Sequence, residues 1–159
     1  MDGSEDHGMS TAELRIVYRP DDDGTGELVA VARSGPFSGE GSAWVGRGKE
    51  TFIAHLRSFP QTATDPPTIE GGFWDGRGNL DQCLLRIVTK PYDSRGRLLV
   101  HVDLASPVWK APDADLQSST TIRFLTEYAA MDTFADHLEQ VLNGKRDEAI
   151  LKGVTGWNS

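Results

Sequence analysis

Hydrophobic residues recur at every second position over most of this chain, which is the pattern of β-strands with one buried face. The runs are short, and clusters of Gly, Pro, Asp and Asn, the residues that favour turns, separate them. The pattern predicts strands over residues 14–18, 28–32, 37–45, 69–74, 80–89, 97–105 and 118–126. The turn cluster over residues 20–26 predicts that the first two strands form a hairpin.

The hydrophobic spacing changes to three or four residues in two segments, and this spacing is typical of amphipathic helices. The first predicts a short helix over residues 49–59, which Pro60 ends. The second predicts a longer helix over residues 128–142. We expect a further helical turn over residues 147–151.

The predicted order of elements is β-β-β-α-β-β-β-β-α, and the short links favour antiparallel neighbours. We therefore expect an α+β fold: a twisted antiparallel sheet of six or seven strands with two main helices packed on one face. Residues 13–152 are expected to form one domain, between a disordered leader over 1–12 and a flexible tail over 153–159.

Alternation assigns the later strands two different faces. One face is apolar and is expected to be buried under the helices; it carries Cys83, Leu85, Ile87, Leu98, Val100, Val102, Leu104, Ile122 and Phe124. The other face mixes polar and apolar residues, and it carries Leu84, Arg86, Val88, Leu99, His101, Asp103, Arg123 and Leu125. An apolar patch with a polar rim is typical of a surface that binds a partner.

Composition limits the classes of function. The chain has 159 residues, of which 38% are hydrophobic and 25% charged, as in an ordinary globular domain. The net charge of −8 argues against nucleic acid as a partner, because phosphates attract Lys and Arg. We expect no membrane span, because no apolar run approaches about 20 residues. The lack of a signal-peptide pattern and the single cysteine fit a cytoplasmic protein.

The segment GGFWDGRG, residues 71–78, concentrates four glycines between two predicted strands. It is interpreted as a tight turn, because it does not lie between a strand and a helix that could hold phosphate. Phe73 and Trp74 should face opposite sides of the sheet. One ring is expected in the core and the other on the mixed face, where Trp74 is the candidate anchor for a partner.

Histidines and acids suggest a metal site, and a surface network of the same residues is the simpler interpretation. His101 and Asp103, two positions apart on one strand, would share a face, and His137 could complete a two-histidine, one-carboxylate set. His137 is expected on the opposite side of the sheet, so we favour a surface network of His101 and Asp103 with Arg86 or Arg123. We expect no metal, no cofactor and no catalytic residue.

Two further segments have a possible ionic role. The acids of residues 21–23 do not fit the calcium-loop spacing and are interpreted as a solvated turn. Residues 46–49, with two basic side chains before a helix, could meet an anion or form a plain helix entry, and the helix entry is favoured.

The segments GEGSAWVG, GGFWDGRGNL and HVDLASP, with the closing helix, resemble small bacterial domains of unknown function. The resemblance covers residues 35–144, about two thirds of the chain. It implies an α+β fold and a bacterial origin, and it carries over no site residues. Some such small acidic proteins are suspected of neutralising toxins.

The sequence supports two main hypotheses of function, beside a third, a purely structural domain of a larger assembly, which the sequence does not separate from the first. The first is a non-catalytic protein-interaction module, with an immunity or regulatory role, that binds a partner or a second copy through the mixed face. Its binding residues would be Trp74, Arg86, Leu99, His101, Asp103 and Arg123. The alternative is a small-molecule-binding protein or enzyme with a cleft between sheet and helices lined by His101, Asp103 and Arg123.

Overall fold

The computed structural model describes residues 10–23, 25–46, 48–109 and 115–156, and it contains eight strands and two helices. In chain order the elements are β1 (Thr11–Pro20), β2 (Gly26–Ser34), β3 (Phe37–Val45), α1 (Lys49–Leu56), β4 (Thr68–Trp74), β5 (Leu80–Pro91), β6 (Arg97–Ala105), β7 (Ser119–Glu127), α2 (Tyr128–Leu142) and β8 (Ala149–Val154). The predicted α+β class is confirmed.

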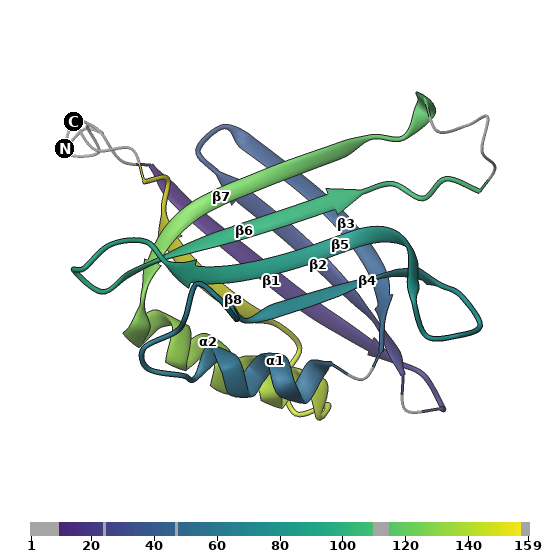
Figure 1. Cartoon of the computed structure of the whole chain (residues 1–159), viewed down its shortest axis with the longest axis horizontal. Helices are drawn as coiled ribbons and strands as arrows, with labels where there is room; N and C mark the ends of the chain where they lie inside the picture. Colours follow the sequence, from purple (N-terminus) through teal and green to yellow (C-terminus); the bar gives the residue numbers. More distant parts are fainter. Residues whose placement is uncertain (1–9, 24, 47, 110–114, 157–159) are drawn as a thin grey trace.

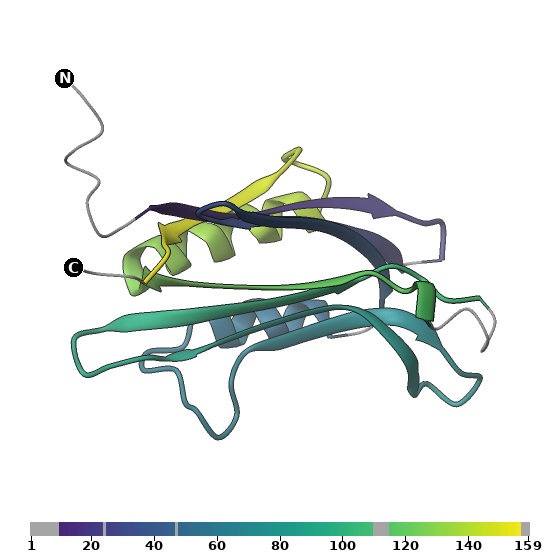
Figure 2. The same ribbon diagram turned by 90° about the horizontal axis from the view of Figure 1, so that it is seen from above.

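The eight strands form one closed barrel, in which every neighbouring pair is antiparallel (Figure 1). Two junctions in the barrel are narrow. β3 pairs with β4 only at Val45 and Gly71, and β7 pairs with β8 only at Leu125 and Val154. The barrel is therefore flattened, with β1, β2 and β8 in one layer and β4, β5 and β6 in another (Figure 2).

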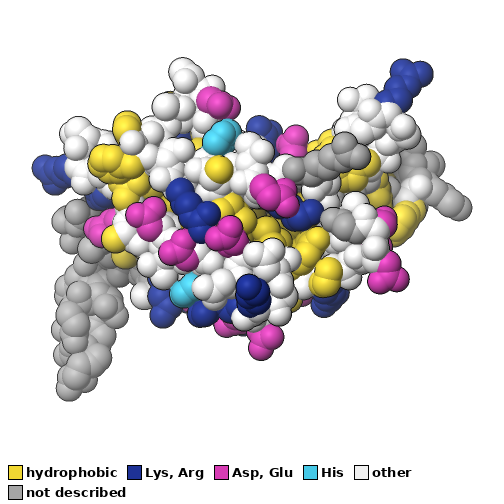
Figure 3. Space-filling model, turned by 90° about the horizontal axis from the view of Figure 1, so that it is seen from below, with side chains coloured by type: hydrophobic (Ala, Val, Ile, Leu, Met, Phe, Trp, Pro, Cys, Tyr) yellow, Lys and Arg dark blue, Asp and Glu magenta, His cyan; other side chains and the backbone are white. Residues whose placement is uncertain are grey.

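The core fills the barrel. Alternate residues of the strands point inward, and they form one buried cluster with the apolar residues of the helices. α2 lies against β8 and β1, and α1 lies beside α2 below the strands in Figure 1. Arg57, just after α1, joins the two helices by ion pairs to Asp136 at 2.8 Å and Glu139 at 2.9 Å. Seen from below, this side mixes charges of both signs with hydrophobic side chains (Figure 3).

The expected sheet of six or seven strands is corrected in two respects. The sheet closes on itself, so its buried face is the interior of a barrel. The helical turn predicted over residues 147–151 is wrong, because Ala149–Val154 forms the strand β8 and pairs with β1. Ala149 and Leu151 are buried while Lys152 is exposed, which is the alternation of a strand with one face in the core.

The predicted burial of Cys83 is wrong, and a β-bulge is the reason. Gly71 pairs with Leu85 but the next residue, Gly72, pairs with Cys83, so Leu84 is an extra residue in β5. An extra residue reverses the alternation on one side of the bulge. Leu84 and Leu85 are consequently both buried, and Cys83 is exposed.

Leu125 also departs from the predicted mixed face, since it is only 3% exposed. It pairs with Val154 at the end of β8. Gly153 and Gly156 allow the chain to approach closely, because a Cβ at Gly153 would collide with the Leu125 carbonyl oxygen and one at Gly156 would lie 3.3 Å from the Leu125 side chain. β8 therefore covers Leu125, which the sequence pattern predicts on the mixed face.

The segment GGFWDGRG forms a turn between β4 and β5, as predicted. The Asp75 side chain accepts hydrogen bonds from the backbone N–H groups of Arg77 at 2.8 Å and Asn79 at 2.9 Å. Gly78 has a φ of 84°, in the left-handed region that glycine adopts readily. These bonds lower the pKa of Asp75 and keep the turn closed.

The described ends of the chain lie together, because the Thr155 N–H donates to the Ser10 carbonyl oxygen at 2.9 Å. β1 begins inside the expected leader and β8 extends into the expected tail. The rest of these two segments, residues 1–9 and 157–159, lies outside the described residues.

Within the described part of the chain, neither helix has the length and apolar character needed to cross a membrane.

Candidate functional site

His101 and Asp103 lie on the outer face of β6, where the sequence placed them on a shared face. His101 Nε2 lies 3.0 Å from Asp103 Oδ2, and the Thr121 hydroxyl donates to Asp103 Oδ1 at 2.6 Å. Arg123 Nε donates to His101 Nδ1 at 3.4 Å. Since Nδ1 accepts this bond, the proton of a neutral imidazole is on Nε2, which donates to Asp103.

The network keeps Asp103 ionised. Partial burial by itself would raise the pKa of Asp103, but the hydrogen bonds from Thr121 and His101, together with the Arg123 charge, outweigh it and hold the pKa below its usual value. The Asp103 side chain is 44% exposed. Exposed pairs of this kind stabilise a fold by at most about 1 kcal/mol.

The remaining predicted residues do not complete a site around His101. Arg86 lies opposite Asp103 in the strand register, but its ion pair, at 3.8 Å, is with Glu70 on β4. Leu99 is half-buried beside this network. With Leu84 and Leu125 in the core, the apolar part of the mixed face is smaller than the sequence suggested.

The described structure has three cavities to consider, and none of them is lined by His101, Asp103 or Arg123. One is a groove of about 570 Å³ between β3 and the β4–β7 layer. It exists because β3 separates from β4 beyond the single pair of Val45 and Gly71. Its size is in the range of ligand-binding clefts.

Aromatic side chains form one wall of the groove. The Phe73 and Trp109 rings lie 4.8 Å apart, measured between centroids. The loop that carries Trp109 is held by Gln82, whose side-chain amide donates to the Val108 carbonyl and accepts from the Val108 N–H, both at 2.9 Å. This pair of bonds holds the backbone next to Trp109, whose exposed ring lies beside the groove.

Small residues of β3 form the floor. Gly39 and Gly41 point inward, and a Cβ at Gly39 would collide with Thr120 while one at Gly41 would lie 3.2 Å from Leu104. The backbone of β3 can therefore lie close to β6 and β7. The small side chains that the sequence showed on one side of this strand are explained by this close approach.

The edge of β3 faces the groove. The Trp44 carbonyl oxygen points away from β2, because it accepts a hydrogen bond from Trp74 Nε1 on β4 at 2.9 Å. In a strand, alternate residues direct their N–H and C=O groups to the same side. The main-chain groups of Ser42 and Glu40 therefore also point away from β2, toward the groove that they line.

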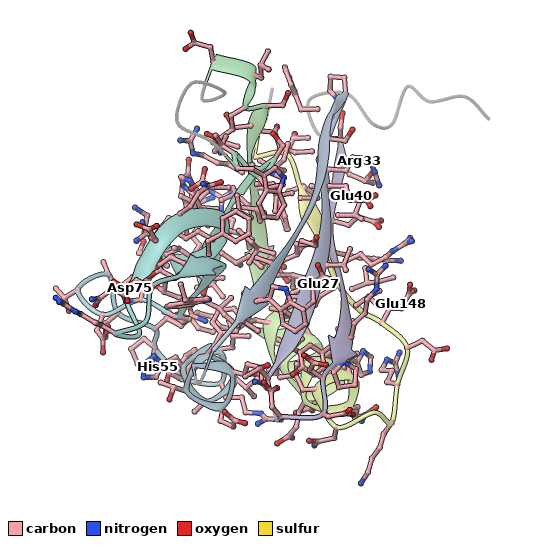
Figure 4. All side chains as sticks on the ribbon, turned by 90° about the vertical axis from the view of Figure 1, so that its right-hand side faces the viewer. Glu27, Arg33, Glu40, His55, Asp75 and Glu148 are labelled. Atoms are coloured by element: carbon pink, nitrogen blue, oxygen red, sulfur yellow. The ribbon has the colours of Figure 1, made fainter. Side chains whose placement is uncertain are left out.

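The groove is acidic at its border. Glu27 on β2 and Glu40 on β3 line it, and Figure 4 labels both on this hairpin, with Asp75 on the opposite side of the barrel. Glu27 is paired with Arg19 at 3.3 Å. A ligand in the groove would meet aromatic surface, strand main chain and negative charge.

Trp74 lies away from the other predicted binding residues. It contacts Trp44 at the β3–β4 junction and lines a second cavity there, whereas Phe73 packs against the core and lines the groove. Trp44, Phe73 and Trp109 were not predicted as a group from the sequence. They lie in three separate segments of the chain, and no sequence pattern links them.

The basic segment before α1 is not open to an anion through Lys49. Its ammonium group donates to the Gly46 carbonyl at 3.2 Å and lies 5.7 Å from the centre of the Tyr18 ring. Lys49 is only 8% exposed, and these two contacts occupy its ammonium group. Arg47, the other basic residue of this segment, lies outside the described residues.

No group of three or more His, Cys, Asp and Glu side chains is placed to hold a metal ion in the described ranges. His137 lies on α2, and His101 on the outer face of β6. Comparisons with models of protein families, with curated proteins and with solved structures found no match to this chain.

Proposed function

We propose that this protein is a non-catalytic protein-binding module that takes an extended segment of a partner into the groove beside β3. The observation that carries the proposal is the open edge of β3 next to an aromatic-lined groove. A strand edge offers main-chain hydrogen bonds to an extended peptide, and adjacent pockets select its side chains.

Charge favours a basic partner segment. Glu40 borders the groove beside Glu27, which is paired with Arg19, and the whole chain carries a net charge of −8. Complementary charge speeds association and selects among partners. A cytoplasmic module that binds a basic segment of a regulated or toxic protein is consistent with these features, and nucleic acid is disfavoured by the same charge.

The groove replaces the outer face of β5–β7 as the main binding surface in this proposal. That face keeps Arg86, Leu99, His101, Asp103 and Arg123, but its polar groups already bind one another. Buried aromatic anchors contribute more to protein binding than exposed polar contacts. The outer face is left as a secondary surface for a partner or a second copy.

The test is selection of binders from a library of random 12-residue peptides, followed by NMR titration of the enriched sequences. We expect chemical-shift changes in the amides of residues 38–44 and a weakening of at least tenfold in Ser42→Pro. Proline removes an N–H that points to the groove, and it leaves the pairing with β2 in place. Ser42→Ala, which keeps that N–H, is the matched control.

Two outcomes would refute the proposal. One is that no peptide is enriched above the background of the library. The other is that enriched peptides bind Ser42→Pro and Ser42→Ala equally well and shift signals away from β3.

A further inference from the structure

The second cavity lies where the β1–β2 turn, the end of β3 and the β4–β5 turn meet. Its volume is about 720 Å³, and its lining includes Trp44, Trp74, Asp21, Asp23 and Thr25. It adjoins the groove, because Trp44 lines both. Three segments far apart in the chain thus bring two indole rings and two carboxylates to one hollow.

The indole rings are partly open to solvent and one of them is fixed. Trp44 is 42% exposed and Trp74 is 39% exposed, which is unusual for side chains of this size. Trp74 is held by the bond from its Nε1 to the Trp44 carbonyl. The faces of indole rings attract cations, more strongly than those of Tyr or Phe.

The carboxylate of Asp23 is also held in place. Its Oδ1 accepts bonds from the Thr25 hydroxyl at 2.6 Å and from the Thr25 N–H at 3.0 Å. These bonds lower the pKa of Asp23, so it is negatively charged at neutral pH. The neighbouring backbone is closed by a bond from the Asp21 N–H to the Thr25 carbonyl at 2.9 Å.

We propose that this cavity binds an organic cation, with an alkylammonium or guanidinium group between the two indoles and the two carboxylates. The cavity is too large for a single bare metal ion. Hard metal ions also require about six or more oxygen ligands, and an indole supplies none. Aromatic rings together with carboxylates are instead the chemistry that binds an organic cation, through cation–π attraction and charge.

The cation could belong to a Lys or Arg side chain of a polypeptide or to a free amine, and the two share one chemistry. Binding of a cation in this cavity is independent of peptide binding in the groove, because small ions alone can measure it. The groove is tested through the amides of residues 38–44 and Ser42→Pro. The cavity is tested through the two indoles and the two acids.

The experiment is NMR titration with tetramethylammonium chloride, N-acetyl-lysine methylamide and a 12-residue Lys-containing peptide, each against sodium chloride at equal ionic strength. We expect the indole N–H signals of Trp44 and Trp74 to shift and to saturate. Asp21→Asn, Asp23→Asn and Trp44→Ala should each weaken binding at least fivefold. Asp22→Asn is the matched control, because it removes the same charge from the same turn at a residue that does not line the cavity.

The small ions and the peptide distinguish the source of the cation. If both small ions bind, a free cation is sufficient to occupy the cavity. If the peptide binds and the small ions do not, the cavity takes a side chain of a polypeptide. Two results would overturn the proposal. One is that Asp22→Asn weakens binding as much as Asp21→Asn and Asp23→Asn do, and the other is that sodium or calcium chloride shifts the indole N–H signals in the same way. Folding of each variant is checked by circular dichroism, and Asp21→Asn retains the Asp23 bonds that close the turn.

Discussion

The indole nitrogen of Trp74 donates a hydrogen bond to the main-chain carbonyl of Trp44, beside the single residue pair that joins β3 to β4. Gly71 belongs to that pair, and a Cβ on it would lie 2.5 Å from the same carbonyl oxygen. The junction therefore combines a close backbone approach with one side-chain hydrogen bond. Both proposed binding surfaces adjoin this junction.

We predict that Trp74→Phe lowers the free energy of unfolding by about 1 kcal/mol, the typical contribution of one hydrogen bond. The measurement is urea denaturation followed by circular dichroism. Trp44→Phe is the control, because Trp44 accepts this hydrogen bond through its main-chain carbonyl, which the substitution does not change. Equal stability of Trp74→Phe and the wild-type protein would show that the bond does not stabilise the junction.

The bulge in β5 gives a second prediction, because Gly72 has no room for a side chain. A Cβ there would collide with the Gln82 carbonyl oxygen and lie 2.9 Å from the Leu84 backbone nitrogen. We expect Gly72→Ala to destabilise the protein by about 1–3 kcal/mol or more, the range for overpacking. Gly76→Ala, in the turn of the same segment, is the control: no atom lies within 4 Å of its added Cβ, and it should be nearly neutral. Similar losses of stability in both variants would contradict the close contact.

Cys83 gives a third prediction, because the bulge turns it outward. We expect it to react with dithiobis-nitrobenzoate in the folded protein. Partial burial and, second, the negative charge of Glu70 raise the pKa of the thiol. The thiolate, which is the reactive form, is therefore scarcer at pH 8 than in a free cysteine, and the rate should still rise above pH 9.

The matched variant for this reaction is Glu70→Gln, which removes the charge but not the burial. It should react faster than the wild-type protein at pH 8, with a smaller difference at high pH. A thiol that reacts only after urea unfolds the chain would restore the original expectation of a buried cysteine.

The sequence predicted those parts of the fold that depend on local spacing. On β6, the inward positions from Leu98 to Leu104 are buried as the alternation required, and α2 has the predicted bounds. The contact of His101 with Asp103 also follows from their spacing on one strand. In each case the residues that determine the structure are within a few positions of one another.

The errors have causes that lie far away in the chain. The bulge at Leu84 depends on the partner strand β4, because Gly72 lets the backbone of β5 approach closely. Residues 149–154 form a strand because β1 pairs with them across most of the chain length, and tertiary pairing overrides a weak local preference. The groove could not be predicted for the same reason, since β3, the loop with Trp109 and Phe73 meet only after the barrel closes.

The outer network of β6 and β7 gives the last prediction, a dependence of stability on pH. The pKa of Asp103 is lower in the folded protein than in the unfolded chain, where it is about 3.9. Its contribution is therefore fully present above the unfolded value and is lost as the pH falls through the folded value. We expect Asp103→Asn to be less stable than the wild-type protein at pH 7, by under about 1 kcal/mol because the group is partly exposed, and the difference to shrink below about pH 4.

Thr121→Val tests the physical cause, because it removes the shortest hydrogen bond to Asp103 and leaves His101 and Arg123 in place. The pKa of Asp103 in this variant should rise toward its usual value. The measurement is an NMR titration of the Asp103 carboxyl carbon from about pH 2 to about pH 7, which spans the usual pKa of an aspartate. An unchanged titration in Thr121→Val would mean that His101 and Arg123 alone keep the carboxylate ionised, and the stability difference at pH 7 should then depend on His101.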